Sequence, residues 1–336
     1  MGQFARLQTR KIESFEELSD VIAGSQREIV QIESGKVDGS LTHASINDLP
    51  IHVGTFNVGM RSRGGSKRDR MTVCMLTVAT NRVTRGSHES HPGDVMVTAP
   101  GGEQENRYYG GASVFAISPT VADIEASFGT EAQQFDASAW CGHLFAGTAD
   151  TTEFIIPQMH LLIARLGQSS SSLTEEAAEF WKRTIIEAMT ASVIDGVPSM
   201  RDGPTPSALK LIRRVEEYLE TQGARPIHIS QICGQLHVSR RTLHRAFHEA
   251  LGIGPIAFLR YRRLCAVHKA LRSDVPPNET IADLALQFGF LNVGRFAQYY
   301  RELFGEYPSD TKQRAGGTDP RGTGATSQQR DFQQLF

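Results

Sequence analysis

The stretch HVSRRTLHRAFHEALG, residues 237–252, decides how the C-terminal third of this sequence folds. Apolar side chains recur at Leu243, Phe247 and Leu251, which is the spacing of one buried helix face. Ser239 stands just before this run and is a typical N-cap residue. The opposite face is basic and holds Arg240, Arg241, His244 and Arg245. The stretch therefore predicts a helix that displays a basic side.

The same pattern occurs a second time in FLNVGRFAQYYRELFG, residues 290–305. Phe296, Tyr300 and Phe304 repeat the apolar stripe with the same spacing. A short apolar segment precedes each copy, ISQICGQL before the first and IADLALQF before the second. Two short helices joined by a turn, present twice, indicate a duplicated helix-turn-helix, at about residues 229–251 and 281–304.

The segment GPIAFLRYRRLCAVHKALR, residues 254–272, separates the two copies. It has Pro255 in its first turn and ends before the helix-breaking run SDVPPNET, so it reads as one helix. At about 1.5 Å per residue this helix spans roughly 28 Å. That length is close to the ~34 Å repeat of B-DNA, so two heads joined by it can enter successive major grooves.

These motifs resemble the DNA-binding domain of the AraC/XylS transcription regulators, over residues 206–314. The resemblance rests on VSRRTLHRAF, LGIGPIAFLRYRRL and TIADLALQFGFLNVGRFAQYYRELFGEYPS. The segment GFLNVGRFAQYYRELFGEYPSDT is most similar to the branch that contains ethanolamine-utilisation regulators. The family implies one domain of two helix-turn-helix units on a linker helix.

The resemblance also implies which residues touch DNA. Base contacts fall on Arg241, His244 and Arg245 in the first recognition helix, and on Gly294, Arg295 and Gln298 in the second. Phosphate contacts or packing roles fall on Arg240, Arg262 and Arg263. Arginine reads guanine and glutamine reads adenine, each with about 1–3 kcal/mol of discrimination. The chain departs from the common pattern at Gln298, where the family often has Arg, and at Asn292, where a Ser often caps the helix.

Charge divides the chain in the same way. The formal net charge is only −2, yet residues 205–315 hold 16 Lys and Arg against 10 Asp and Glu. The excess of acid lies in residues 1–204. A basic module attached to an acidic one is expected for a DNA-binding domain joined to a domain that does not touch DNA.

Composition sets the class of protein. A chain of 336 residues with 40% hydrophobic residues is long enough for two folded domains. No apolar run approaches a membrane span and the N-terminus has no apolar signal region, so we expect a cytoplasmic protein without membrane partners. The four cysteines are scattered, which favours reduced thiols over disulfides, a zinc site or redox sensing: Cys74, Cys141, Cys233 and Cys265.

The N-terminal region, from about residue 28 to residue 118, is rich in short β-type runs separated by turn sequences. This pattern predicts a barrel or a jelly roll. HPGDVMVTAPGG, residues 91–102, also resembles the turn and strand of the cupin-like sensing domain in AraC relatives. We therefore expect a cupin-like β-barrel whose interior holds a small organic effector, with lining residues that the sequence does not reveal.

A metal cupin or enzyme is the main alternative. Metal cupins use H-x-H with a nearby Glu, whereas His88 and His91 are three apart and would point to opposite faces of a strand. These histidines are better placed in a surface turn, and no catalytic motif occurs elsewhere. We expect no metal, no cofactor and no enzymatic activity.

Two helical stretches follow the β region. Phe180, Thr184 or Ile185, Met189 and Val193 form a stripe that packs on the chain's own barrel or forms the seam of a homodimer. The predicted fold is two-domain α+β, with a cupin-like barrel and an all-α double helix-turn-helix domain. Its parts are a sensing domain at 1–150, a helical packing or dimerisation segment at 151–196, a linker at 197–206, the DNA-binding domain at 207–314 and a disordered tail at 315–336.

The sequence thus predicts an effector-responsive, sequence-specific DNA-binding transcription regulator, and the resemblance favours an activator. Its predicted partners are double-stranded promoter DNA, RNA polymerase, a small-molecule effector and a second copy of the chain. Two other classes stay open: an enzyme or metal-binding cupin tethered to DNA, and a nonspecific architectural DNA binder.

Overall fold

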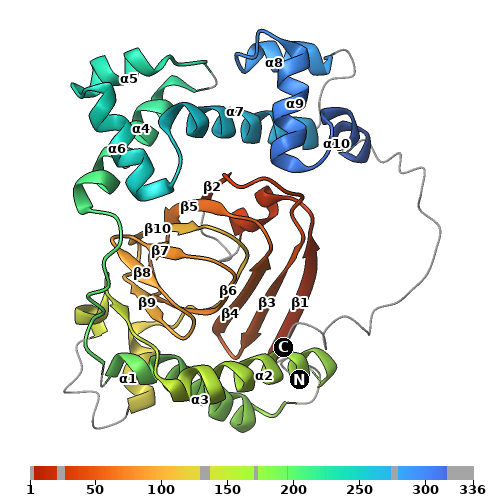
Figure 1. The fold of residues 1–336 in the computed structure, drawn as a ribbon. Helices are drawn as coiled ribbons and strands as arrows, with labels where there is room; N and C mark the ends of the chain where they lie inside the picture. Colours follow the sequence, from red (N-terminus) through yellow and green to blue (C-terminus); the bar gives the residue numbers. More distant parts are fainter. Residues whose placement is uncertain are drawn as a thin grey trace.

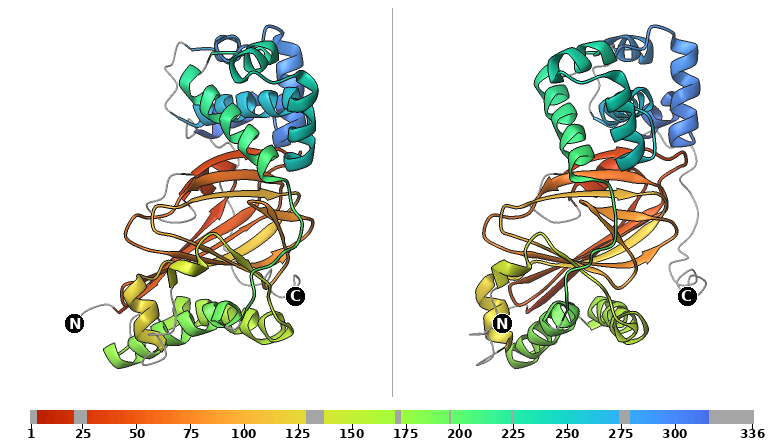
Figure 2. Two further views of the ribbon diagram at one scale, coloured as in Figure 1. Left: turned by 90° about the vertical axis from the view of Figure 1, so that its left-hand side faces the viewer. Right: turned by 60° about the vertical axis from the view of Figure 1, so that its left-hand side comes forward.

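The computed structural model describes residues 4–20, 27–128, 137–169, 173–194, 196–223, 225–273 and 279–315. The predicted tail at 315–336 lies outside these residues from 316 onward. Figure 1 shows three layers: helices α1 to α3 beneath, two β-sheets in the middle and the helical C-terminal part above. Figure 2 shows the same order of layers from two other sides.

The first sheet has seven strands and all its pairings are antiparallel. Its order is β1 (Ala5–Ile12), β3 (Gly39–Ile46), β4 (Leu49–Phe56), β11 (Ala112–Ile117), β6 (Thr72–Ala79), β9 (Val95–Thr98) and β12 (Leu144–Phe145). β1 lies before the region that the sequence marks as β. Its residues ARLQTRKI are mostly exposed, so this edge strand gives no apolar signal.

The second sheet has five strands, again antiparallel. Its order is β2 (Arg27–Gln31), β5 (Met60–Gly65), β10 (Glu103–Tyr108), β7 (Val83–Arg85) and β8 (His88–Ser90). Among the described strands none pairs with a strand of the other sheet, so the prediction of a closed barrel is wrong. Two facing sheets and a barrel need the same alternation of inward and outward residues, and the sequence therefore does not distinguish them.

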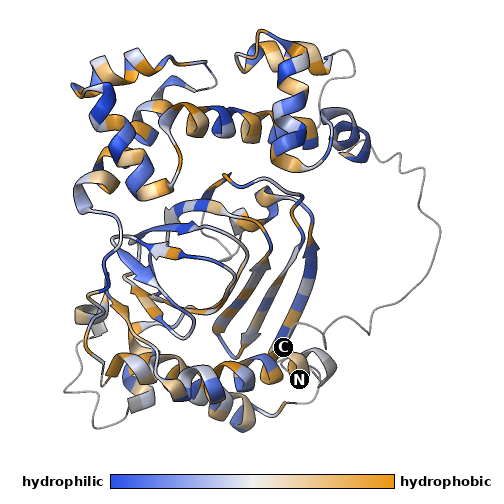
Figure 3. Cartoon of the chain, viewed as in Figure 1, coloured by the Kyte–Doolittle hydropathy of each residue, from blue (hydrophilic) through white to orange (hydrophobic). Residues whose placement is uncertain are grey.

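The seven-stranded sheet is covered on both faces. Ile51, Met75 and Phe115 lie on the face that packs against helices α2 (Ile156–Ser169) and α3 (Glu175–Ile194). The alternate positions, among them Phe56 and Val114, face the five-stranded sheet. A short helix α1 (Val121–Phe128) contacts α3. Figure 3 shows hydrophobic residues on most strands, with hydrophilic residues prevailing on the edge strands β1 and β8.

The apolar stripe that the sequence predicts on α3 is buried at some positions and exposed at another. Ile185, Met189 and Val193 are buried in the cluster beneath the sheet. Phe180 is 63% exposed, and Leu161 of α2 is also exposed. The C-terminal part of the stripe thus lies in the cluster beneath the sheet, while a dimer seam stays a prediction.

The C-terminal part is helical, as the sequence predicts. It consists of α4 (Pro206–Gln222), α5 (Ile229–Leu236), α6 (Arg240–Leu251), α7 (Pro255–Arg272), α8 (Ile281–Gln287), α9 (Val293–Phe304) and α10 (Pro308–Ala315). Its core is continuous with that between the sheets. Phe15, in the short helix η1 (Phe15–Asp20), stacks on Phe304 of α9 with ring centroids 5.9 Å apart. Among the described helices none is long and apolar enough to cross a membrane.

Candidate nucleic-acid interface

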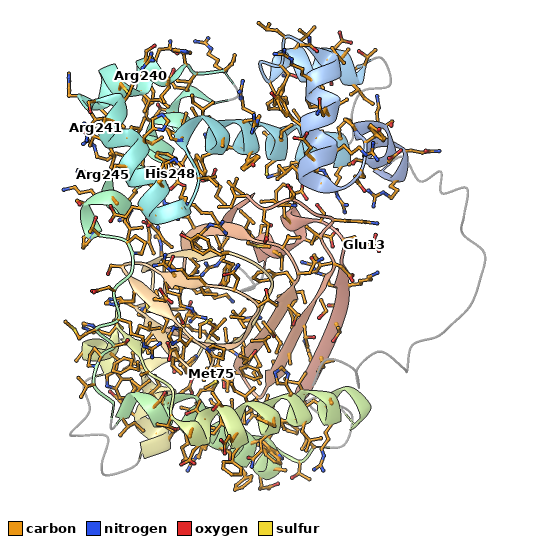
Figure 4. All side chains as sticks on the ribbon, viewed as in Figure 1. Glu13, Met75, Arg240, Arg241, Arg245 and His248 are labelled. Atoms are coloured by element: carbon orange, nitrogen blue, oxygen red, sulfur yellow. The ribbon has the colours of Figure 1, made fainter. Side chains whose placement is uncertain are left out.

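Helix α6 separates a buried face from an exposed basic face. Leu243, Phe247 and Leu251 are fully buried, as the periodicity predicts. Ser239 caps the helix, with Oγ accepting from the N–H of Thr242 at 3.0 Å. Arg240, Arg241 and Arg245 are exposed and His244 is half-buried. Figure 4 shows Arg241 and Arg245 pointing from α6 away from the β-sheets.

The turn before α6 sets the angle between α5 and α6. His237 ends α5 in the left-handed conformation with φ 53°, a region that residues other than glycine enter uncommonly. The N–H of Val238 then bonds to the carbonyl of Cys233 at 3.1 Å. Ile232 and Leu236 of α5 are buried beside α6. The turn thus holds α6 against α5 while its basic face stays open.

Helix α9 repeats this construction with different surface residues. Phe296 and Tyr300 are fully buried, and Asn292 Oδ1 accepts from the N–H of Arg295 at 2.9 Å, so Asn replaces Ser as the cap. The predicted base-contacting residues Gly294, Arg295 and Gln298 are all exposed. The amide of Gln298 donates to Glu302 Oε1 at 3.1 Å within the same helix.

Helix α7 joins the two heads, which lie at its opposite ends (Figure 1). Two of its arginines, predicted to contact phosphate, already have partners inside the protein. Arg262 Nε donates to Glu28 Oε1 of β2 at 3.0 Å. Arg263 lies over the ring of Phe290 at 5.0 Å, and burial lowers its pKa. Of the predicted phosphate contacts, Arg240 is exposed, while Arg262 and Arg263 are half-buried.

The sheet domain also binds the C-terminal ends of both recognition helices, which the sequence does not reveal. At α6, Arg107 Nε donates to the carbonyl of Leu251, and the hydroxyl of Tyr109 donates to that of Ala250, both at 3.2 Å. At α9, the N–H of Gly35 and the side-chain amide of Gln31 donate to the carbonyl of Leu303 at 3.0 and 2.9 Å. The last carbonyls of a helix lack partners within it, so these donors complete both helix ends.

Ion pairs reinforce this contact on the outer face of the five-stranded sheet. Arg61 of β5 holds Glu216 of α4 through Nε at 2.6 Å and Nη2 at 2.8 Å, with both side chains buried. Burial lowers the pKa of Arg61, but the charge of Glu216 and its hydrogen bonds outweigh burial and raise the pKa. Arg213 of α4 also pairs with Glu105 of β10 at 2.8 Å.

The histidines considered for metal binding lie apart from this surface. His88 bridges to Asp202 through the backbone, while the exposed ring of His91 lies 3.4 Å from Glu89 Oε1. Within the described part of the chain no group of three or more His, Cys, Asp or Glu side chains is arranged to hold a metal ion.

Known proteins match the helical part of the chain. Residues 232–314 match the family described as a helix-turn-helix domain. XylDLEGF operon transcriptional activator 2 of Pseudomonas putida is 37% identical over 98 residues, which are 29% of this chain and 62% of that protein. The probable thc operon regulatory protein of Rhodococcus erythropolis is 34% identical over 107 residues, or 32% of each protein.

A solved structure matches about a third of the chain. It is that of a probable AraC family transcriptional regulator from Rhodopseudomonas palustris, which is 40% identical over 32% of this chain and 97% of that chain, with a TM-score of 0.30. The match to the Rhodococcus relative thus covers about a third of its length.

Proposed function

Because its C-terminal domain belongs to the AraC/XylS family of helix-turn-helix regulators, we propose that this protein is a sequence-specific, effector-responsive transcription regulator. The observation that carries the proposal is the pair of exposed recognition faces, on α6 and α9, joined by one linker helix. Relatives in the helical domain are described as transcriptional activators, which supports activation rather than repression. We place its action in the cytoplasm, with promoter DNA and RNA polymerase as partners.

The first head carries the stronger proposed readout. Arg241 and Arg245 are exposed on one side of α6, where each can grip a guanine edge with two donors, and His244 lies beside them. In the second head we assign base contacts to Arg295 and Gln298, with Gly294 allowing close approach of the backbone. Gln298 must first release Glu302 to reach a base. We assign a phosphate contact to the exposed Arg240. Arg262 must first break its hydrogen bond to Glu28 before it can contact a phosphate.

The tethers at the helix ends support a route from effector to DNA. Both recognition helices end on carbonyls bound by residues of the sheets, so a shift of those strands repositions the heads. An effector that binds one arrangement more tightly raises its population. We place the effector in the sheet domain, which we propose to be related to the cupin-like sensors despite its open sheets.

Two finer assignments complete the proposal. Exposed Phe180 and Leu161 on the lower helices offer apolar surface for a homodimer. The sequence of the second helix-turn-helix unit, GFLNVGRFAQYYRELFGEYPSDT, supports a relation to the ethanolamine-utilisation branch. That relation concerns the DNA-binding helices and does not identify the effector.

The test is selection of genomic fragments by the full-length protein, followed by mobility shifts with the selected promoter DNA. We expect Arg241→Ala with Arg245→Ala to abolish the specific shift, while Arg165→Ala, an exposed arginine on α2, retains it. Random DNA that competes as well as the selected DNA would contradict sequence-specific binding and support the architectural alternative. A stoichiometric metal in the purified protein would support the metal-cupin alternative.

A further inference from the structure

The space between the two sheets has an unusually polar lining on the side of the five-stranded sheet. Arg27 of β2 donates through Nη2 to Gln104 Oε1 at 2.5 Å and through Nη1 to Ser62 Oγ at 3.4 Å. Arg85 of β7 donates through Nη1 to the carbonyl of Cys74, in the opposite sheet, at 2.7 Å. Two arginines therefore point inward, on the face opposite to the one that contacts the helical domain.

Neither inward arginine has an acidic partner among the side chains that the structure describes. Arg85 is only 1% exposed, and its Nε and Nη2 have no hydrogen-bond partner within the described part of the chain. A buried unpaired cation is costly, and such groups are normally paired. Burial lowers the pKa of Arg27, and the nearby charge of Arg85 acts in the same direction. The interior thus carries positive charge without compensation.

The two unpartnered nitrogens of Arg85, Nε and Nη2, form one edge of its guanidinium group. Nε and Nη2 lie side by side on a guanidinium, and two parallel N–H bonds from that edge grip a carboxylate or phosphate. Arg61 shows the edge when it is filled, because its Nε and Nη2 hold the two oxygens of Glu216 at 2.6 and 2.8 Å. In Arg85 the same edge is buried and has no partner.

Two side chains of the opposite sheet keep some exposed surface near Arg85. Cys74 lies in the middle of β6, between β11 and β9, and its side chain faces the other sheet. A side chain in that position is covered from both sides, yet Cys74 is partly exposed, as is Met96 beside it. A pocket of about 400 Å³ lies between β2 and the helical domain; Arg27 and Ile29 line it, whereas Arg85 does not.

The remaining neighbours suit an anion with an apolar body. Burial raises the pKa of Tyr108, so its hydroxyl keeps its proton and can donate, and its ring lies 4.9 Å from that of Phe56. Burial, with the nearby His43, lowers the pKa of His52 to about 3, so this histidine adds no charge. Val83 and Val114 add apolar surface to the same cluster.

We infer that the space between the sheets binds a small organic anion, whose carboxylate or phosphate group is held by the Nε and Nη2 edge of Arg85 with Arg27 beside it. The inference rests on the proposed function, because it names the class of effector to which the regulator responds. Such an anion bridges the sheets, since Arg85 already bonds to Cys74 of the opposite one. Arg27 belongs to β2, which also carries Glu28 and Gln31 toward the helical domain.

The test is thermal unfolding of the full-length protein at constant ionic strength with butyrate, with inorganic phosphate, or with neutral butyramide. We expect the wild-type melting temperature to rise with butyrate or phosphate and to stay unchanged with butyramide. Butyrate and phosphate separate a carboxylate from a phosphate ligand. Arg85→Met should lose this response, and without added anion it should melt at or above the wild-type temperature, because an unpaired buried charge is gone. The exposed Arg165→Met is the matched control and should respond like the wild type.

Equal responses of wild type and Arg85→Met, including no response by either, would overturn the inference. If Arg85→Met does not fold, Arg85→Lys serves instead: it keeps the charge but lacks the two-donor edge, so half-saturation should need about tenfold more anion or higher. Equal half-saturation in Arg85→Lys and wild type would again overturn it. The thermal assay contains no DNA, so a failure of the proposed function would appear separately, as the absence of a mobility shift.

Discussion

The two recognition helices share their internal construction and differ in what they display. Both α6 and α9 are capped by a side-chain oxygen and end at a glycine with φ 72°, Gly252 and Gly305. Both bury their apolar stripe. Helix α6 exposes three arginines, whereas α9 exposes two, Arg295 and Arg301, together with the apolar Val293. Leu291, just before α9, is 89% exposed. Burial and capping thus constrain the two helices alike, while the solvent-facing positions are free to diverge.

The two heads are also attached to the sheets by different chemistry. The end of α6 is held by the guanidinium of Arg107, whose pKa burial lowers to about 10, so it stays charged at neutral pH. A cation at a helix C-terminus is favoured by the helix dipole. The end of α9 is held by two neutral amides, from Gly35 and Gln31. The first attachment therefore depends on charge and the second does not.

The largest effects are expected where the two heads are alike. Phe296→Ala in α9 should reduce the free energy of unfolding by about 3–5 kcal/mol and Leu243→Ala in α6 by about 2–5 kcal/mol, because both side chains are fully buried. Urea denaturation measures both. Arg241→Ala on the exposed face of α6 is the control and should change stability little. Equal destabilisation by the control would mean that the faces of the helix are assigned incorrectly.

The next prediction compares the loss of a buried ion pair between the sheets and the helical domain with the loss of neutral hydrogen bonds between them. Glu216→Gln leaves the buried Arg61 with only the more distant Glu105, at 3.8 Å, and should destabilise the protein by about 3 kcal/mol. Gln31→Ala removes one NH2 group, whose two hydrogens are shared among the carbonyls of Glu33, Gly35 and Leu303, and should cost only about 2 kcal/mol. Thermal unfolding of the two variants makes the comparison. A larger loss in Gln31→Ala would show that the neutral attachment of α9 contributes more to stability than the ion pair between β5 and α4.

A pH effect on stability is expected at the second head. Beneath α9, Glu16 lies 3.8 Å from His268, which bonds to Tyr300. Burial raises the pKa of Glu16 from 4.5 to about 7, so the folded chain holds this proton more tightly than the unfolded chain. The resulting stabilisation is fully present below pH 4.5 and is lost as pH rises through 7. His268 acts oppositely: burial lowers its pKa to about 3, so its contribution is present above pH 6.5 and is lost as pH falls toward 3.

Replacing the carboxyl isolates its part of this profile. Glu16→Gln cannot lose the proton, so relative to wild type it should gain about 2–3 kcal/mol of stability between pH 4.5 and pH 8. Urea denaturation at the two pH values measures the difference. Parallel profiles for variant and wild type would show that Glu16 is not protonated in the folded chain at neutral pH.

The smallest effects concern base readout. Arg245→Ala should relax preference at a few adjacent bases by about 1–3 kcal/mol for each lost two-donor contact. Gln298→Ala should relax it more weakly and about one helical turn away, since Gln298 is engaged with Glu302. Binding selection on randomised DNA with each variant distinguishes the sites. If both variants alter the same bases, the two heads do not read separately.

Much of the helical domain follows from the sequence. The positions that repeat every four residues, such as Leu243 and Phe296, are buried, because periodicity within one helix decides its buried face. Sheet closure is different. The same alternation along β4 and β11 serves a barrel and two facing sheets, so the number of sheets depends on strand pairing between distant segments. Phe180 shows the same limit, since it lies on the predicted stripe but remains exposed.

Contacts between the domains lie beyond any local pattern. The duplicated helices, their caps and the basic face of α6 can be predicted from the sequence, because residues within four positions of each other decide these features. Only the tertiary structure placed Arg61 against Glu216, Gln31 against the end of α9, and Arg85 without a partner between the sheets. Each of these contacts depends on strands and helices that are far apart in the chain. An arginine in the sequence does not reveal whether its guanidinium will contact a carboxylate, water or no partner in the folded protein.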